Sequence, residues 1–129
     1  MSTAEARYLK IDYDEVIRKL RDYAKSKATA HEGVKAIVLT GSLAKGNYTG
    51  CSDADILIIA DNLPGQVLDR YAIFAEADLP VDVEPRAYSP EEFLSMVRQG
   101  DHFAIETLEV GVSLYGGGYF RGLKQHVTK

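Results

Sequence analysis

Two aspartates, Asp53 and Asp55, stand two residues apart at the start of an apolar run that ends at Ala60. Side chains alternate along a strand, so both carboxylates would lie on one face, about 6.6 Å apart along the strand. The strand that follows is apolar on both faces. Two carboxylates at its start repel each other, and both lose hydration there. A divalent cation removes that cost, and Mg²⁺ is commonly held by one or two carboxylates together with substrate phosphates. The pair therefore predicts a magnesium site that handles phosphate.

A glycine–serine pair, Gly41 and Ser42, precedes the aspartates with ten residues between them and follows a strand-like run at 34–40. Glycine allows the backbone to approach a ligand closely, and the N–H groups at a helix start favour phosphate oxygens. Lys45, in the same segment, could contact phosphate or could be an ordinary solvated lysine. The segment is not a P-loop, because Asn-Tyr stands where that motif has Lys followed by Ser or Thr. No Gly-x-Gly-x-x-Gly occurs in the chain, which disfavours a dinucleotide-binding fold.

The spacing of these two pairs resembles the signature of the nucleotidyltransferase superfamily that includes DNA polymerase beta. Ser52, just before the first aspartate, belongs to the same pattern. The short length resembles the minimal nucleotidyltransferases of that superfamily, and the resemblance covers roughly residues 34–115. It implies a third acid on a later strand, flanked by apolar residues. Asp82, between two valines, fits this position, with Glu84 on the same face as a reserve candidate. Asp82 could also be an outward-facing strand residue.

The resemblance implies a reaction in which a hydroxyl attacks the α-phosphate of a nucleoside triphosphate, such as ATP, and pyrophosphate leaves. Asp53 and Asp55 would hold two Mg²⁺ ions about 3.5–4 Å apart. Asp82 would complete the metal near the nucleophile and could help to take its proton. Gly41 and Ser42 would bind the β- and γ-phosphates. The family more often has arginine at the position of Lys45, which keeps the charge but lacks the bidentate fork.

The acceptor is the open question, because 129 residues leave no room for a second, acceptor-binding domain. Minimal nucleotidyltransferases resemble the antitoxin half of a two-protein module whose partner is a small helical HEPN-domain ribonuclease. The resemblance implies transfer of AMP to a tyrosine of that partner. Two alternatives stay open: transfer to a small molecule such as an aminoglycoside, with a separate helical subunit, or a non-catalytic antitoxin that neutralises its partner by contact. Clustered acids are costly to keep, which argues against the last.

The apolar periodicities predict an α/β (α+β) fold, a small mixed sheet of about four strands flanked by helices, which is also the fold of the polymerase-beta-like superfamily. We expect one domain, 1–129, with its core at about 34–115. The tail, 116–129, starts with three glycines that suggest a flexible joint; its apolar residues would serve docking or pack on their own domain. The expected helices are about 12–30, capped by Asp12 or Asp14, Pro64 toward Ala77, Ser89 toward Gly100 and Asp101 through Leu108; the strands are 34–40, 54–60, 81–84, closed by Pro85, and 112–115.

Composition limits the class of protein. A hydrophobic content of 46% and a charged content of 26% are ordinary for a globular domain. The net charge of −4 argues against general nucleic-acid binding, which needs a basic face. No apolar run is as long as a membrane span, and the N-terminus lacks a signal-peptide core. The single Cys51 suits a cytoplasmic protein, and homo-oligomers are compatible with the sequence.

Overall fold

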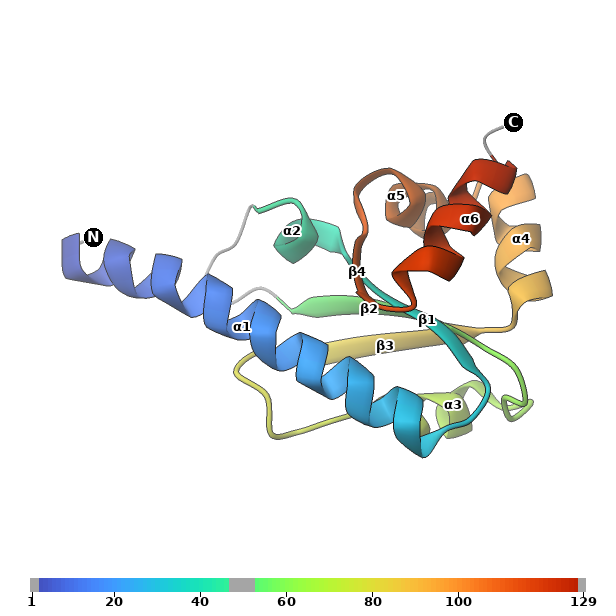
Figure 1. Ribbon diagram of the computed structural model, residues 1–129, viewed down its shortest axis with the longest axis horizontal. Helices are drawn as coiled ribbons and strands as arrows, with labels where there is room; N and C mark the ends of the chain where they lie inside the picture. Colours follow the sequence, from blue (N-terminus) through green and yellow to red (C-terminus); the bar gives the residue numbers. More distant parts are fainter. Residues whose placement is uncertain (1–2, 47–52, 128–129) are drawn as a thin grey trace.

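A four-stranded sheet in the order β3–β2–β1–β4 forms the middle layer of the molecule (Figure 1). The structure is a computed structural model that describes residues 3–46 and 53–127, and in the first helix the side chains from residue 13 onward. β1 pairs antiparallel with β2 and with β4, whereas β2 and β3 are parallel. This mixed sheet confirms the expected fold class. The strands are β1 (Val34–Thr40), β2 (Ala54–Ala60), β3 (Val83–Tyr88) and β4 (Val112–Tyr115).

Helices cover both faces of the sheet (Figure 1). α1 and α3 pack on one face, and α4, α5 and α6 pack on the other. None of the helices in residues 3–46 and 53–127 combines the length and the apolarity that a membrane crossing requires. The helices are α1 (Thr3–Ala30), the short α2 (Gly41–Ala44), α3 (Val67–Phe74), α4 (Pro90–Arg98), α5 (His102–Val110) and α6 (Gly117–Val127).

β2 belongs to two hydrophobic cores at once. Its Ile56 and Ile58 pack with Leu20 of α1, while Leu57 and Ile59 pack on the other face with α4, α5 and α6. Burial on both faces explains why the run is apolar at both parities. Alternation then places the side chain of Asp55 on the same face as Leu57, the α5 side of the sheet.

Two helix starts follow the sequence signals closely. Ser89 caps α4 in a capping box: its hydroxyl accepts from the Glu92 N–H, and the Glu92 carboxylate accepts from the Ser89 N–H at 2.8 Å. The Asp101 carboxylate caps α5 by accepting from the Ala104 N–H at 3.0 Å. These two helices were predicted with their caps, and both caps are confirmed.

Two other helices differ from their expected bounds. α1 begins at Thr3 rather than near Asp12 or Asp14, because the residues before them are mostly good helix formers and extend the helix without a cap there; the side chain of Asp12 lies outside the described ones. α3 is shorter than expected at both ends. Gln66 is its N-cap, and Pro64 stays in the preceding loop, where its carbonyl accepts from Arg70 Nε at 2.6 Å.

The expected third strand was misplaced. It was predicted at 81–84 and closed by Pro85, but β3 begins at Val83 and continues through that proline to Tyr88. β3 is an edge strand, which needs ladder hydrogen bonds on one side only and so can hold a proline. Asp82 therefore lies just before the strand, where its carbonyl accepts from the Ala54 N–H at 2.8 Å.

The C-terminal tail is part of the fold. Of the three glycines that suggested a flexible joint, Gly117 and Gly118 belong to α6, and the Gly116 carbonyl just before it accepts from the Phe120 N–H at 3.0 Å. Phe120 is only 5% exposed, and Leu123 and Val127 pack in the same core at helical spacing. The tail thus follows the second expectation, packing on its own domain, rather than the docking role.

Candidate active site

The glycine–serine pair and the aspartate pair meet at the end of β1. Thr40 stands opposite Asp55 in the antiparallel register, and the chain turns at Gly41 with φ of +80°. A Cβ atom built on Gly41 would collide with the Asp55 carboxylate oxygen Oδ2. Only glycine therefore fits this turn without strain, both for its left-handed backbone and for the carboxylate beside it. The two halves of the sequence motif form one structural unit.

The other acids lie at the same end of the sheet. Glu84 is the register partner of Asp55 across the parallel β2–β3 ladder, and Asp82 adjoins Ala54 through its backbone. Asp53 and Asp82 are exposed, each just before the start of its strand. Within the described ranges, no three His, Cys, Asp or Glu side chains are close enough together to hold a metal ion. The structure thus brings the three predicted aspartates to one end of two neighbouring strands without gathering their carboxylates.

Asp55 is the most perturbed acid of this group. Burial raises the pKa of its carboxyl, the negative charges of Glu84, Asp53 and Glu106 raise it further, and Arg86 opposes them. Repulsion among nearby carboxylates and loss of hydration both disfavour the ionised form. The site is therefore negatively charged before any ligand binds, and a cation would relieve that repulsion. Carboxylate oxygens are also the donors that Mg²⁺ prefers, so the residues present suit that ion in chemical type.

Lys45 pairs with an acid that the sequence did not single out. Its ammonium lies 3.0 Å from Glu106 Oε2 on α5, and His102 Nε2 is 3.5 Å from the same oxygen. A phosphate contact by Lys45 therefore stays a prediction, and it would compete with this ion pair. Glu106 escaped the sequence reading because it is one acid on an ordinary amphipathic helix. Its place beside the site depends on the packing of α2 against α5.

Two more residues of the site were missed. Thr40 is buried, and its hydroxyl has no hydrogen-bond partner among the described residues. Its signal was a polar residue that ends an otherwise apolar strand directly before Gly41. Arg86 lies on the same face as Glu84, two residues along β3, with its guanidinium 4.5 Å from the centre of the Phe103 ring. Arg86 was missed because the third strand was predicted to end at residue 84, whereas β3 continues to Tyr88.

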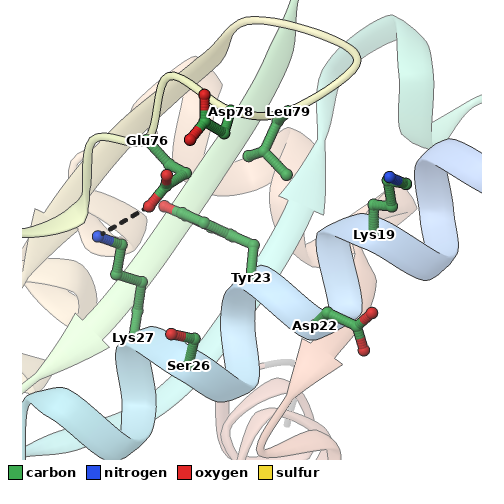
Figure 2. A pocket seen from close by; sticks show the side chains of 8 residues that line it. All are labelled: Lys19, Asp22, Tyr23, Ser26, Lys27, Glu76, Asp78 and Leu79. Atoms are coloured by element: carbon green, nitrogen blue, oxygen red, sulfur yellow. Dashed lines mark ion pairs between the residues drawn. The ribbon is translucent and has the colours of Figure 1, made fainter.

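A separate hollow of about 340 Å³ lies between α1 and the segment that leads to β3 (Figure 2). Tyr23 reaches across it and donates a hydrogen bond to the Phe74 carbonyl at 2.6 Å. Lys27 pairs with Glu76 at 3.4 Å, as the dashed line in Figure 2 marks. The hollow contains none of the predicted site residues and is not part of the acidic site. The hydrogen bond of Tyr23 and the ion pair of Lys27 across it attach α1 to the rest of the domain.

The sequence profile of a family described as "Nucleotidyltransferase domain" matches residues 17–109, well over half of the chain. The chain belongs to this family. The match includes the glycine–serine pair, all three predicted aspartates and Glu106. The expected resemblance is thereby confirmed at the level of the nucleotidyltransferase family. Ser52 and Cys51 fall within the matched range but outside the residues that the structure describes.

Three individual proteins are similar to this nucleotidyltransferase. A protein of Methanocaldococcus jannaschii, provisionally named a protein adenylyltransferase, is 34% identical over 76 residues, or 50% of this chain and 52% of its own. The chain thus spans about half the length of this relative. A nucleotidyltransferase provisionally so named from Sulfolobus solfataricus superimposes with a TM-score of 0.54, at 16% identity, over 78% of this chain and 80% of its own.

The third is a crystal structure described as a toxin–antitoxin with AMP-PNP, which also superimposes with a TM-score of 0.54. It is 17% identical to this nucleotidyltransferase, and the superposition covers 83% of this chain and 88% of that one. At such identities the two solved structures establish a shared fold. They confirm that the four-stranded mixed sheet with flanking helices is the fold of nucleotidyltransferases.

Proposed function

We propose that this nucleotidyltransferase transfers AMP from ATP to a hydroxyl, and that the hydroxyl belongs to a tyrosine of a HEPN-domain partner for which this chain is the antitoxin. The observation that carries the proposal is the contact between Gly41 and the Asp55 carboxylate, which joins a phosphate-binding turn to the acidic end of β2. The name of the M. jannaschii relative supports a protein acceptor, and the toxin–antitoxin structure supports an antitoxin role.

In this proposal, residues on one side of Asp55 bind the phosphates and residues on the other side take the acceptor proton. The turn at Gly41 and Ser42 offers backbone N–H groups and a hydroxyl to the β- and γ-phosphates. The acceptor oxygen forms a bond to the α-phosphorus, the bond from that phosphorus to the bridging oxygen breaks, and pyrophosphate leaves. Asp82 receives the hydroxyl proton, with Glu84 as the neighbouring alternative. Lys45, once released from Glu106, would neutralise phosphate charge.

Magnesium completes the proposed site. Asp53, Asp55 and Asp82 would hold two Mg²⁺ ions, which neutralise the negative charge on the attacking and leaving oxygens when bound. Burial is the largest cause of the raised pKa of Asp55, and the neighbouring carboxylates add to it. A bound cation would relieve the repulsion among these carboxylates. We therefore expect ATP to bind clearly with Mg²⁺ and weakly in EDTA.

A titration separates a catalytic antitoxin from one that acts by contact. A fixed, small amount of this chain is mixed with increasing amounts of the proposed HEPN-domain partner, in the presence of ATP and Mg²⁺, and RNA cleavage is followed. A catalyst silences a molar excess of partner, because one copy modifies many. The silenced partner also stays inactive after separation and gains the mass of AMP, because the adduct is covalent.

The matched control is the double variant Asp53→Asn with Asp55→Asn. It keeps the size of both side chains and should keep the fold, yet transfer should fall by about a thousandfold or more because the charges that act on the reacting oxygens are gone. Inhibition that stops at one copy per partner, reverses on separation and survives in the double variant would refute the proposed transfer.

A further inference from the structure

α3 presents apolar side chains to solvent. Val67 is 78% exposed and Leu68 is 81% exposed, and Tyr71, one turn later, is also exposed. The same helix buries Phe74 completely, so it is anchored to the domain and its first turn is a fixed surface. Short amphipathic helices normally turn their apolar residues inward. Neighbouring aliphatic side chains left in water on an anchored helix mark a candidate interaction surface.

This apolar surface is linked to the acidic end of the sheet through Tyr71. Val67 and Tyr71 line a hollow of about 320 Å³ together with Pro85–Tyr88, the later part of β3. A hollow of about 510 Å³ lies between the end of α3 and the start of β3. Tyr71 lines it on one side, and Asp82 and Glu84 line it on the other. Tyr71 therefore joins the exposed side chains at the start of α3 to the hollow that contains the acid proposed to take the acceptor proton.

The charge of this region restricts what can bind. Residues 61–92 contain eight acidic and two basic residues, a formal charge of −6, although the whole chain carries only −4. Three of these acids are already paired: Glu92 with Arg70 at 2.8 Å, Asp61 with Lys35 at 3.3 Å and Glu76 with Lys27 at 3.4 Å. With the two lysines counted, the region still keeps a formal charge of −4. A second copy of this chain would bring the same negative surface and would be repelled. A partner with basic residues around an apolar centre is complementary.

We infer that α3 and the exposed edge of β3 form the docking surface for the acceptor protein, whose contact surface is apolar at its centre and rich in Lys and Arg at its rim. The inference rests on the proposed function. If the β- and γ-phosphates lie at Gly41, pyrophosphate leaves on the β1 side of Asp55. In-line displacement then requires the hydroxyl to approach from the opposite, β3 side. The exposed apolar surface lies on that side.

The test uses ATP radiolabelled at its α-phosphate and two matched variants. Val67→Ser with Leu68→Ser removes the apolar centre, and both side chains are so exposed that the fold should not change. Tyr115→Ser is the control, because Tyr115 is a 39% exposed aromatic on β4, at the opposite edge of the sheet. Labelling is measured with the purified HEPN-domain protein and, in parallel, in an extract of the native cell.

The expected result is a rise of about tenfold or more in KM for the labelled protein in the double variant, with kcat at saturation and KM for ATP unchanged. Tyr115→Ser should match the wild type. Equal KM values for all three proteins would overturn the docking surface while leaving the proposed function intact. No labelled protein with the wild type in either arm would refute the proposed function, and the inference with it. A wild-type dimer in sedimentation that the double variant loses would assign the surface to a second copy and also overturn the inference.

Discussion

The two edge strands of the sheet, β3 and β4, differ in the side chains that they expose. β4 is contacted by α1 from one face and by α6 from the other, and its Leu114 is buried. β3 is contacted by α3 and α4, but its exposed positions carry the charged side chains of Glu84 and Arg86, with Asp82 just before them. Both edge strands are contacted by helices, and they differ in that the exposed positions of β3 carry charged side chains.

The difference suggests a division of roles within one small sheet: some strands mainly stabilise the domain, and others carry the residues of the proposed reaction. β1 and β4 build the part of the core that α6 completes, whereas the starts of β2 and β3 hold carboxylates in place of apolar residues. Clustered carboxylates cost stability, so a domain can keep them only where the rest of its core compensates. The β4 edge adds Leu114 to the core, whereas the β3 edge carries the acids that belong to the proposed site.

The largest expected effect tests this division by stability. Phe120→Ala should lower the free energy of unfolding by about 3–5 kcal/mol, because it empties a buried aromatic site under α6. Leu68→Ala should change it by at most about 0.5 kcal/mol, because the side chain is already in water. Urea denaturation followed by circular dichroism measures both. Similar losses in the two variants would contradict the division.

Much of this fold could be predicted from sequence because its signals are local. The bounds of β1, β2 and β4 follow from apolar runs, and the starts of α4 and α5 follow from Ser89 and Asp101 at their caps. The errors arose where tertiary context decides. A proline such as Pro85 would end an interior strand, but an edge strand can continue through it. Gly117 and Gly118 form part of α6, because Phe120 packs in the core.

The candidate site shows the same limit. Gly41 and the aspartate pair were found because their spacing along the chain matches a known pattern, and the structure places Gly41 beside Asp55. Glu106 and Arg86 were not found, because they join the site only through the packing of α5 and the true length of β3.

A smaller effect is expected at the turn between the two regions. Gly41→Ala places a methyl group against Asp55, and Gly46→Ala has nothing within 4 Å, although both glycines have φ near +80°. Each variant should lose about 1–2 kcal/mol of stability through its left-handed backbone. Only Gly41→Ala should also displace the carboxylate and slow AMP transfer by about a hundredfold. Steady-state kinetics beside thermal melts separate the two effects, and equal activity in both variants would mean that the contact between Gly41 and Asp55 has no role in transfer.

The smallest expected effect concerns the ion pair that joins α3 to α4 across the β3 edge. Arg70 donates to Glu92 at 2.8 and 3.3 Å, and this hydrogen bonding, with that from the Ser89 N–H, lowers the pKa of the Glu92 carboxyl below its ordinary 4.5. Glu92→Gln keeps the size and the cap acceptor but removes the charge. Since Glu92 is well exposed, solvent screens the pair, and the loss at neutral pH should be about 0.5 kcal/mol.

The pH dependence of that loss identifies its cause. A carboxyl whose pKa is lowered by folding contributes stability above its unfolded pKa and loses it as the pH falls through the lowered folded value. The difference in urea midpoint between wild type and Glu92→Gln should therefore be constant from about pH 5 to 8 and shrink in more acid solution. Glu91→Gln is the control, an exposed acid on the same turn of α4 with no ion pair among the described residues. A difference for Glu92→Gln that persists unchanged below pH 4.5 would assign its effect to the cap alone, and the link across the β3 edge would then add nothing to stability.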